Sequence, residues 1–152
     1  MDLKRFNVRV YFALRNAKGD QLLLADEIIR GKAYTKFPGG GLEFGEGPID
    51  CALREAREEL GQEIEITGHL YTTDFFLPSA FRPEDQVISI YYHARLLEAP
   101  RFRTSGKRFD FLQEKDDEES FRWVSLHALS TEEFELPADR LVADILRTSQ
   151  VD

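Results

Sequence analysis

The fold is decided by Phe37-Pro38-Gly39-Gly40-Gly41-Leu42-Glu43-Phe44-Gly45-Glu46-Gly47-Pro48, which is followed directly by Ile49-Asp50-Cys51-Ala52-Leu53-Arg54-Glu55-Ala56-Arg57-Glu58-Glu59-Leu60-Gly61. The first half is a glycine-rich loop, and the second half has the periodicity of an amphipathic helix. The apolar residues of that helix share one face: Ile49, Ala52, Leu53, Ala56 and Leu60. Pro48 suits a first helical turn and Gly61 suits the residue after the last turn, so we predict a helix over 48–60 that docks on a sheet.

Beside the apolar face, Glu55, Glu58 and Glu59 form an acidic stripe. Spacings of three and four residues place these side chains on one side of a helix, where like charges repel by roughly 0.2–0.5 kcal/mol per pair. A divalent cation that prefers oxygen ligands would compensate this repulsion. The alternative is a solvated acidic face, which an isolated E-x-x-E-E pattern would favour. The fixed distances to the glycine loop favour the metal site.

The same stretch resembles the Nudix box, whose pattern is G-x5-E-x7-R-E-U-x-E-E-x-G-U, where U is a bulky aliphatic residue. The matching residues are Gly40, Glu46, Arg54, Glu55, Glu58, Glu59 and Gly61. Two positions depart from the pattern, because Ala56 is smaller than the usual aliphatic residue and Gln62 is polar. Both are packing positions, so the charged residues that would carry the chemistry are unaffected.

The resemblance implies an α/β fold, specifically an α/β/α sandwich around a central mixed sheet, and one Nudix domain over residues 1–152. It also implies that Arg54 orients a box glutamate and that Glu46 supports the loop.

The metal site is likewise implied by the resemblance. Glu58 and Glu59 would be the firmest ligands of Mg²⁺ or Mn²⁺, and Glu55 would be a ligand or the general base. A main-chain carbonyl near Gly40 would complete the coordination.

The rest of the chain alternates between strand-like and turn-like segments, which indicates an α/β architecture. Extended segments are expected at 7–14, 21–25, 33–37, 63–67, 70–77, 87–97 and 121–126, and a closing amphipathic helix at 138–146. Residues 28–32 are expected to form a loop. Segment 87–97 is apolar on both faces, so we expect a buried central strand there.

The long polar connection 98–119 carries further candidate ligands. It ends in Asp116-Asp117-Glu118-Glu119, just before the strand that contains Trp123. Nudix enzymes commonly supply another acidic metal ligand or base from this region, and Glu118 and Glu119 are the preferred candidates. An acidic run is otherwise a solvated loop.

Residues that could recognise a substrate lie in two of the loops. The candidates to stack on a nucleobase are Phe75, Phe76, Phe81, Arg82, Phe109 and Phe111. Core packing or loop anchoring is an equal alternative for each of them. Residues 101–108 form the one locally basic stretch, which would contact a terminal phosphate, bind a partner or, as the favoured alternative, remain a solvated loop.

Composition limits the possible functions. The chain has 152 residues, a formal net charge of −8 and a single cysteine, Cys51, which excludes an internal disulfide. The charge argues against a broad basic face for long nucleic acids, but a small polyphosphate substrate is compatible with it if metal ions bridge the carboxylates and phosphates. No apolar run approaches the ~20 residues that span a bilayer, and no signal segment follows Met1. We therefore expect a cytoplasmic protein without membrane partners.

The leading hypothesis is a metal-dependent pyrophosphohydrolase that cleaves a nucleoside diphosphate linked to another moiety. The first substrate candidates are nucleoside triphosphates, oxidised ones included, and nucleotide sugars such as ADP-ribose. One alternative is a catalytically silent nucleotide-sensing or binding module with the same fold, and a weaker one is an isomerase of a diphosphate-bearing substrate. A P-loop is excluded, because no Lys-Ser or Lys-Thr follows the glycines. Members of the family are often homodimers, but no feature of this sequence requires one.

Overall fold

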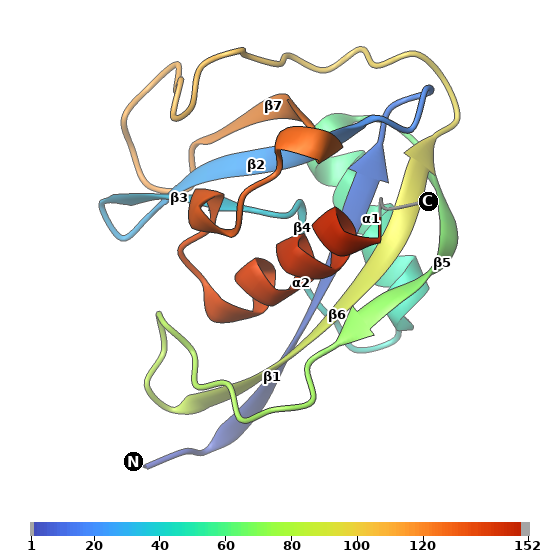
Figure 1. Ribbon diagram of the computed structural model, residues 1–152. Coiled ribbons are helices and arrows are strands. Elements are labelled where there is room, and N and C mark those ends of the chain that lie inside the picture. Colours follow the sequence, from blue (N-terminus) through green and yellow to red (C-terminus); the bar gives the residue numbers. More distant parts are fainter. Residues whose placement is uncertain (1, 150–152) are drawn as a thin grey trace.

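The structure, a computed structural model, describes residues 2–149 and contains a mixed sheet between two helices (Figure 1). The strands are β1 (Arg5–Arg15), β2 (Gln21–Ile29), β3 (Lys32–Lys36), β4 (Gly39–Gly41), β5 (Ile64–Thr72), β6 (Asp85–Leu96) and β7 (Glu119–Ser125). The helices are α1 (Pro48–Leu60) and α2 (Pro137–Thr148), and two short 3₁₀ helices, η1 (Leu126–Ala128) and η2 (Thr131–Glu133), connect β7 to α2. This architecture confirms the expected α/β/α sandwich. Within residues 2–149, no helix is both long and apolar enough to cross a bilayer.

The sheet forks between β1 and β2. These two strands share a single pair, Arg15 with Leu22, and then diverge (Figure 1). In the gap between them, β3 pairs with β2, whereas β4 pairs with β1. The chain crosses from one side of the fork to the other at 37–38, where the Phe12 amide donates to the Pro38 carbonyl at 3.0 Å. The glycine loop therefore starts inside the fork.

On its other edge, β1 pairs with β6 in parallel along its full length, from Arg5 with Asp85 to Arg15 with Arg95. Strand β5 continues the sheet beyond β6, so β6 has a strand on each side. This position confirms the prediction that the segment 87–97 is a central strand.

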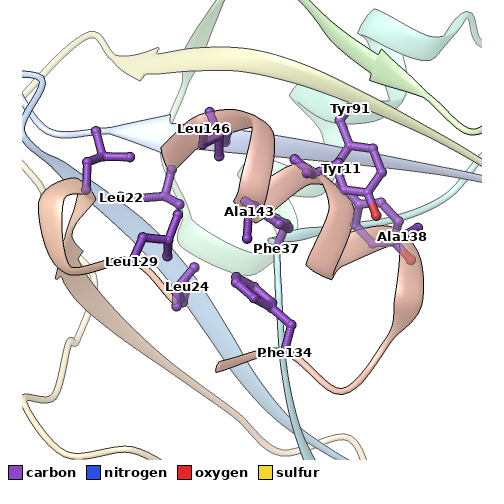
Figure 2. Close-up of a cluster of buried hydrophobic side chains, with 13 residues drawn as sticks. Tyr11, Leu22, Leu24, Phe37, Tyr91, Leu129, Phe134, Ala138, Ala143 and Leu146 are labelled. Atoms are coloured by element: carbon purple, nitrogen blue, oxygen red, sulfur yellow. The ribbon is translucent and has the colours of Figure 1, made fainter. Parts of the chain in front are cut away.

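The side chains of β1 alternate between two hydrophobic cores, one under each helix. The core under α1 contains Val10, Phe12 and Leu14 of β1 together with Ala52, Ala56 and Leu60 of the helix. The core under α2 contains Tyr11, Ala13, Leu22, Leu24, Phe37, Tyr91, Phe134, Val142 and Leu146 (Figure 2). Within it, the rings of Phe37 and Phe134 stack at a centroid distance of 5.0 Å.

Helix α1 has the predicted bounds because both of its ends are capped. The Gly47 amide donates to Asp50 Oδ2 at 3.0 Å at the start of the helix. At the other end, Gly61 adopts a left-handed conformation with φ 66°, and its amide donates to the Arg57 carbonyl at 3.0 Å.

Both departures from the box pattern have packing roles. Ala56 is completely buried against the sheet, so its small side chain lets α1 approach closely. Gln62 is also buried, and its polar atoms are satisfied: Nε2 donates to the Ala99 carbonyl at 3.1 Å and Oε1 accepts from the Arg101 amide at 2.6 Å. The polar residue thereby fastens the start of the 98–118 connection beside α1.

The predicted loop at 28–32 is wrong. Strand β2 continues to Ile29 and β3 begins at Lys32, which leaves a turn of only Arg30 and Gly31. Both turn residues have positive φ angles, 51° and 79°, which is the geometry of a tight hairpin.

Two other segment predictions also need correction. The separate strands expected at 63–67 and 70–77 are one strand, β5, which ends at Thr72 and keeps its pairing with β6 through two register shifts. Residues Gly39–Gly41, which are expected to lie in a loop, form strand β4. Glycines provide no side-chain pattern that would predict a strand, but their backbone groups still pair with β1.

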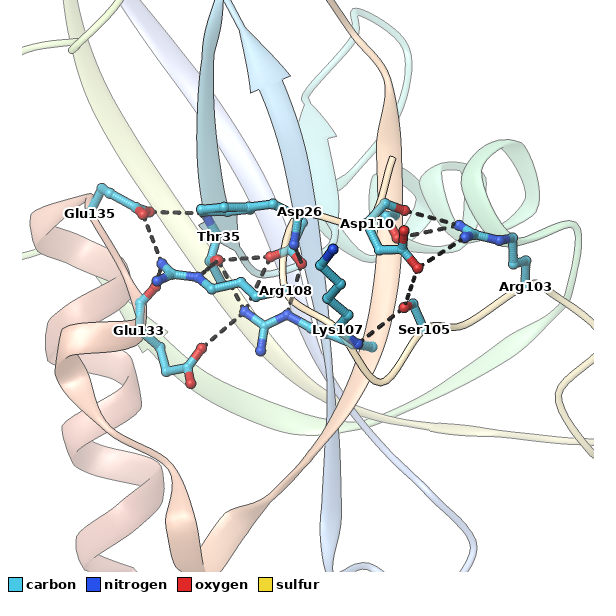
Figure 3. A network of polar contacts seen from close by, with 12 residues as sticks. Asp26, Thr35, Arg103, Ser105, Lys107, Arg108, Asp110, Glu133 and Glu135 are labelled. Atoms are coloured by element: carbon cyan, nitrogen blue, oxygen red, sulfur yellow. Dashed lines mark hydrogen bonds and ion pairs between the residues drawn. The ribbon is translucent and has the colours of Figure 1, made fainter. Parts of the chain in front are cut away.

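A buried ion pair anchors the long connection 98–118 (Figure 3). Arg122 of β7 donates from Nε to Asp26 Oδ2 at 2.7 Å and from Nη2 to Asp26 Oδ1 at 3.2 Å. The Phe109 amide donates to the same carboxylate at 3.1 Å, and Arg108 Nε donates to Thr35 Oγ1 at 3.1 Å. The connection is therefore tied to β2 and β3.

The basic stretch at 101–108 is largely neutralised by carboxylates of the chain itself. Arg101 pairs with Glu98, Arg103 with Asp110 and Arg108 with Glu135. This pairing favours the solvated-loop interpretation of the stretch over a phosphate-binding one.

Asp139 provides a test of how burial affects stability. Its side chain lies between α2 and β6, where Oδ1 accepts from the Tyr91 hydroxyl at 2.6 Å and Oδ2 has no partner within residues 2–149. Burial raises the pKa of Asp139 from 3.8 to about 7. The folded state thus binds this proton more tightly than the unfolded chain, and the contribution to stability is lost as the pH rises from about 4 to 7.

We expect the Asp139→Asn variant to lose less stability than the wild type between pH 4 and pH 7, by up to about 4 kcal/mol. Urea unfolding across this range measures the difference. Asp144→Asn, an exposed site on the same helix, is the matched control and should parallel the wild type. Parallel curves for Asp139→Asn and the wild type would contradict the prediction.

Candidate functional site

Arg54 connects the glycine loop to helix α1. Its Nε and Nη2 donate to the two oxygens of Glu46 at 2.9 and 2.7 Å, and Nη2 also donates to the Gly41 carbonyl at 3.0 Å. On the helix, Nη1 donates to Glu55 Oε1 at 3.0 Å and to Glu58 Oε2 at 3.2 Å. One guanidinium therefore fixes the loop and orients two glutamates of the acidic stripe.

Two neighbours of Arg54 have shifted pKa values. The hydrogen bonds from Arg54 lower the pKa of Glu46 to about 2, so this carboxylate stays ionised. Burial raises the pKa of the Cys51 thiol to about 12, so Cys51 remains protonated at neutral pH. Cys51 is also completely buried under α1, so its role in the fold is packing.

Glu55 packs directly against the backbone of Gly40. A Cβ atom added to Gly40 would lie 2.2 Å from Glu55 Oε1, far inside contact distance. The neighbouring Gly41 has more room, because the nearest atom to its added Cβ would be Arg9 Nη1 at 3.2 Å. Only a glycine at position 40 therefore allows α1 to bring Glu55 against β4.

Glu59 and Glu119 form a partly buried acidic pair behind this contact. Burial raises the pKa of each carboxyl, and the charge of Glu119 raises that of Glu59 further. Within residues 2–149, Oε2 of Glu59 and Oε2 of Glu119 are buried without any hydrogen-bond partner. Buried polar atoms are rarely left unpaired in folded proteins. These two oxygens are therefore suited to bind a cation or a hydrogen-bond donor.

The structure distinguishes between the two acidic candidates before Trp123. Glu119 pairs with Glu27 across β7 and β2, and its charge acts on Glu59. Glu118 precedes the strand and is not among the groups whose charges chiefly shift the pKa of Glu59 or Glu119. The structure therefore brings Glu119 together with the box glutamates and shows no such interaction for Glu118.

The glutamate cluster, defined as Glu55, Glu58, Glu59 and Glu119, has the chemistry of a site for a hard divalent cation. It offers carboxylate oxygens, two of them unpartnered, beside the closely approached backbone of Gly40. Within residues 2–149, no three His, Cys, Asp or Glu side chains converge into a complete set of metal ligands. Arg54 engages Glu55 and Glu58. The Glu58 side chain is 58% exposed and so can change its partner.

Sequence reasoning missed Lys36 and Glu27. The Lys36 ammonium is buried, 2.7 Å from Glu27 Oε1, and its positive charge opposes the pKa rise of Glu59 and Glu119. The only signal in the sequence is a lysine directly before the Phe37-Pro38 step into the glycine loop.

A pocket of about 520 Å³ opens on the α2 side of the fork. Its walls come from β1, the β2–β3 hairpin, the loop at 77–82 and the start of α2. The residues that matter for its chemistry are Arg9, Tyr11, Glu27, Lys36, Tyr91 and Asp139. Because Lys36 and Glu27 belong to this wall and also lie beside the glutamate cluster, the pocket and the cluster meet at this pair.

Only part of the aromatic set expected to recognise a substrate reaches this pocket. Phe81 and Arg82 line it, and the Phe81 ring contacts Tyr34 of β3 edge to face at 5.3 Å. Phe75 and Phe76 are exposed elsewhere. Phe109 and Phe111 stack on each other at 6.2 Å within the 98–118 connection.

Comparisons with known proteins agree with this architecture. The NUDIX domain family matches residues 5–145. Similar solved structures include a NUDIX hydrolase from Nitrosomonas europaea (19% identity, TM-score 0.69, covering 94% of this chain and 89% of that chain). A MutT protein from Methanosarcina mazei has 21% identity and a TM-score of 0.68, with 98% of each chain covered. An ADP-ribose pyrophosphatase from Streptococcus suis has 17% identity and a TM-score of 0.61, covering 96% of this chain and 92% of that chain.

At these identities, the structural matches show the fold alone. No curated protein sequence matches the chain.

We expect Gly40→Ala to weaken Mn²⁺ binding by about tenfold or more, because the added Cβ displaces the Glu55 carboxylate. Gly41→Ala is the matched control on the same short strand, and it should bind Mn²⁺ almost as the wild type does. Electron paramagnetic resonance of free Mn²⁺ measures both affinities, and thermal unfolding shows whether each variant is folded. Equal Mn²⁺ affinities in the two folded variants would contradict the prediction.

A second pair of variants tests which acidic residue belongs to the site. Glu119→Gln should weaken Mn²⁺ binding by about tenfold, since it removes a carboxylate whose Oε2 is buried in the cluster. Glu118→Gln should bind Mn²⁺ within about threefold of the wild type. The same loss of Mn²⁺ affinity in both variants would contradict the assignment of Glu119.

Proposed function

Because the chain belongs to the NUDIX family, we propose that it hydrolyses a phosphoanhydride bond in a nucleoside diphosphate linked to another moiety. The observation that carries the proposal is the glutamate cluster, in which Glu59 and Glu119 each have a buried oxygen without a partner in the described part of the chain. The cluster lies next to a pocket large enough for a small organic group. Nucleoside triphosphates and nucleotide sugars remain the two substrate candidates, and one structural neighbour is named as an ADP-ribose pyrophosphatase.

The glutamate cluster would hold the cation. Glu55, Glu58, Glu59 and Glu119 offer oxygen ligands for Mg²⁺ or Mn²⁺, which when bound would polarise phosphoryl oxygens and lower the pKa of a bound water. The neighbouring backbone of Gly40 could add a carbonyl oxygen to this set.

Arg54 and Glu55 would prepare the site for proton transfer. Arg54 holds Glu55 Oε1 at 3.0 Å and so fixes the carboxylate against Gly40. The hydrogen bond would keep Glu55 oriented so that its carboxylate can accept a proton from an attacking water. Because Arg54 itself is held by Glu46 and the Gly41 carbonyl, it acts as a positioning residue.

The pocket would bind the moiety that is not hydrolysed. Tyr11, Tyr91 and Phe81 provide aromatic surface there, and Asp139 and Ser89 provide polar groups deeper in the wall. This combination of apolar walls with a few polar groups is typical of small-molecule sites. The organic part of the substrate would then lie on the α2 side of the fork, and the scissile diphosphate would lie on the side of the glutamates.

The decisive test is incubation of the purified protein with Mg²⁺ or Mn²⁺ and a panel of nucleoside triphosphates, oxidised nucleotides and nucleotide sugars. We expect at least one compound to be hydrolysed, with release of a phosphate-containing product. For that compound, Glu58→Gln should lower kcat by about a hundredfold or more, since it removes a charged ligand. Glu65→Gln, an exposed glutamate paired with Arg95, is the matched control and should leave kcat unchanged.

Two outcomes would contradict this proposal. Absence of hydrolysis across the panel with either metal would count against catalysis. Retention of nucleotide binding without turnover, both in the wild type and in Glu58→Gln, would instead support a nucleotide-binding module.

A further inference from the structure

Lys36 occupies the point where the two sides of the site meet. It is the last residue of β3, inside the fork of the sheet, and its side chain is only 7% exposed. Its ammonium lines the pocket on the α2 side, while its charge acts on Glu59 and Glu119 on the other side. A group that bridges the glutamate cluster and the pocket must pass this side chain.

The hydrogen-bonding capacity of Lys36 is not exhausted within the chain. A lysine ammonium has three N–H donors, and within residues 2–149 its one charged partner is Glu27, at 2.7 Å. Arg54, by contrast, already directs its donors to Glu46, Glu55, Glu58 and the Gly41 carbonyl. Arg9, which also lines the pocket, is only partly buried and donates from Nε to the Tyr11 hydroxyl at 3.3 Å. Among the described residues that line the pocket, Lys36 is thus a buried cation that still has donors for a ligand.

The charge of Lys36 also matters for the cation. Glu27, Glu55, Glu59 and Glu119 surround this region with negative charge, and Lys36 offsets part of it. A compact positive charge at this position attracts phosphate oxygens and repels a divalent cation. The two effects have opposite signs, so they can be measured separately.

We propose that Lys36 binds a phosphate oxygen of the substrate, at the junction between the pocket and the glutamate cluster. This inference rests on the proposed diphosphate site and adds a direction to it. The phosphate chain runs from the pocket past Lys36 to the glutamates. The charge of Lys36 also lowers the affinity of the glutamate cluster for a divalent cation.

Lys36→Met tests both effects through binding alone. Removal of this positive charge should tighten Mn²⁺ binding by roughly tenfold, because the negative charge of the glutamates is no longer partly neutralised. At saturating Mn²⁺, the same variant should bind imidodiphosphate, a diphosphate analogue with a P–N–P bridge, about tenfold more weakly. Lys32→Gln, an exposed lysine on the same strand, is the matched control and should change neither affinity.

Calorimetry of imidodiphosphate binding and paramagnetic resonance of Mn²⁺ binding provide the two measurements. A purely structural role for Lys36 would weaken both affinities together, whereas the proposal requires them to move in opposite directions. Unchanged imidodiphosphate affinity in Lys36→Met overturns the proposal. Failure of the wild type to bind imidodiphosphate at saturating Mn²⁺ overturns it as well.

A second variant guards against misfolding, because Lys36→Met leaves Glu27 buried without its partner. The double variant Glu27→Gln/Lys36→Met removes both charges of the pair. It should bind Mn²⁺ within about threefold of the wild type but still bind imidodiphosphate about tenfold more weakly. Wild-type affinity of the double variant for imidodiphosphate would overturn the proposal.

Hydrolysis is a separate readout. If the affinities shift as expected but no compound of the panel is hydrolysed, the diphosphate site stands and the proposed catalysis fails. If hydrolysis occurs but Lys36→Met leaves the analogue affinity unchanged, the proposed function stands and the role of Lys36 fails.

Discussion

The guanidinium of Arg54 is the interaction on which the site depends. It joins the loop residue Glu46 to the helix residues Glu55 and Glu58 through charge-assisted hydrogen bonds. These bonds offset the repulsion within the acidic stripe and fix the separation between α1 and the glycine loop. The approach of Glu55 to Gly40 is possible only at that separation, because no side-chain atom lies between them. The arrangement of the glutamate cluster thus depends on the positively charged guanidinium of Arg54.

The second constraint is the fork in the sheet. The glutamates of α1 lie on one face of the sheet, and the pocket beside α2 lies on the other. A continuous sheet would separate them. Because β3 follows β2 and β4 follows β1, the sheet opens between them, and Lys36 and Glu27 occupy the opening. Polar groups can therefore lie deep in the molecule and still face one another.

The sequence predicted the local part of this site well. The bounds of α1 follow from Pro48, Gly61 and the apolar periodicity, all of which are short-range signals. The choice of Glu119 over Glu118 depends instead on the register of β7 against β2. Lys36 acquires its surroundings only when β3 pairs with β2. The sequence predicts a five-residue loop at 28–32, whereas the turn that fixes this pairing has only Arg30 and Gly31. Both features depend on contacts between strands that are distant in the sequence. Such contacts produce no periodic pattern, so the sequence alone does not predict them.

The parallel pairing of β1 with β6 has a consequence for the order in which the molecule assembles. Arg5 pairs with Asp85, so about half of the chain, including the whole of α1, lies between two strands that must find each other. Closing so long a loop is slow compared with forming the β2–β3 hairpin, which needs only neighbouring residues. We expect nascent chains to acquire the hairpin early and the paired central strands late. The glutamate cluster would then be among the last features to form, and early intermediates would expose the sheet face that α1 finally covers.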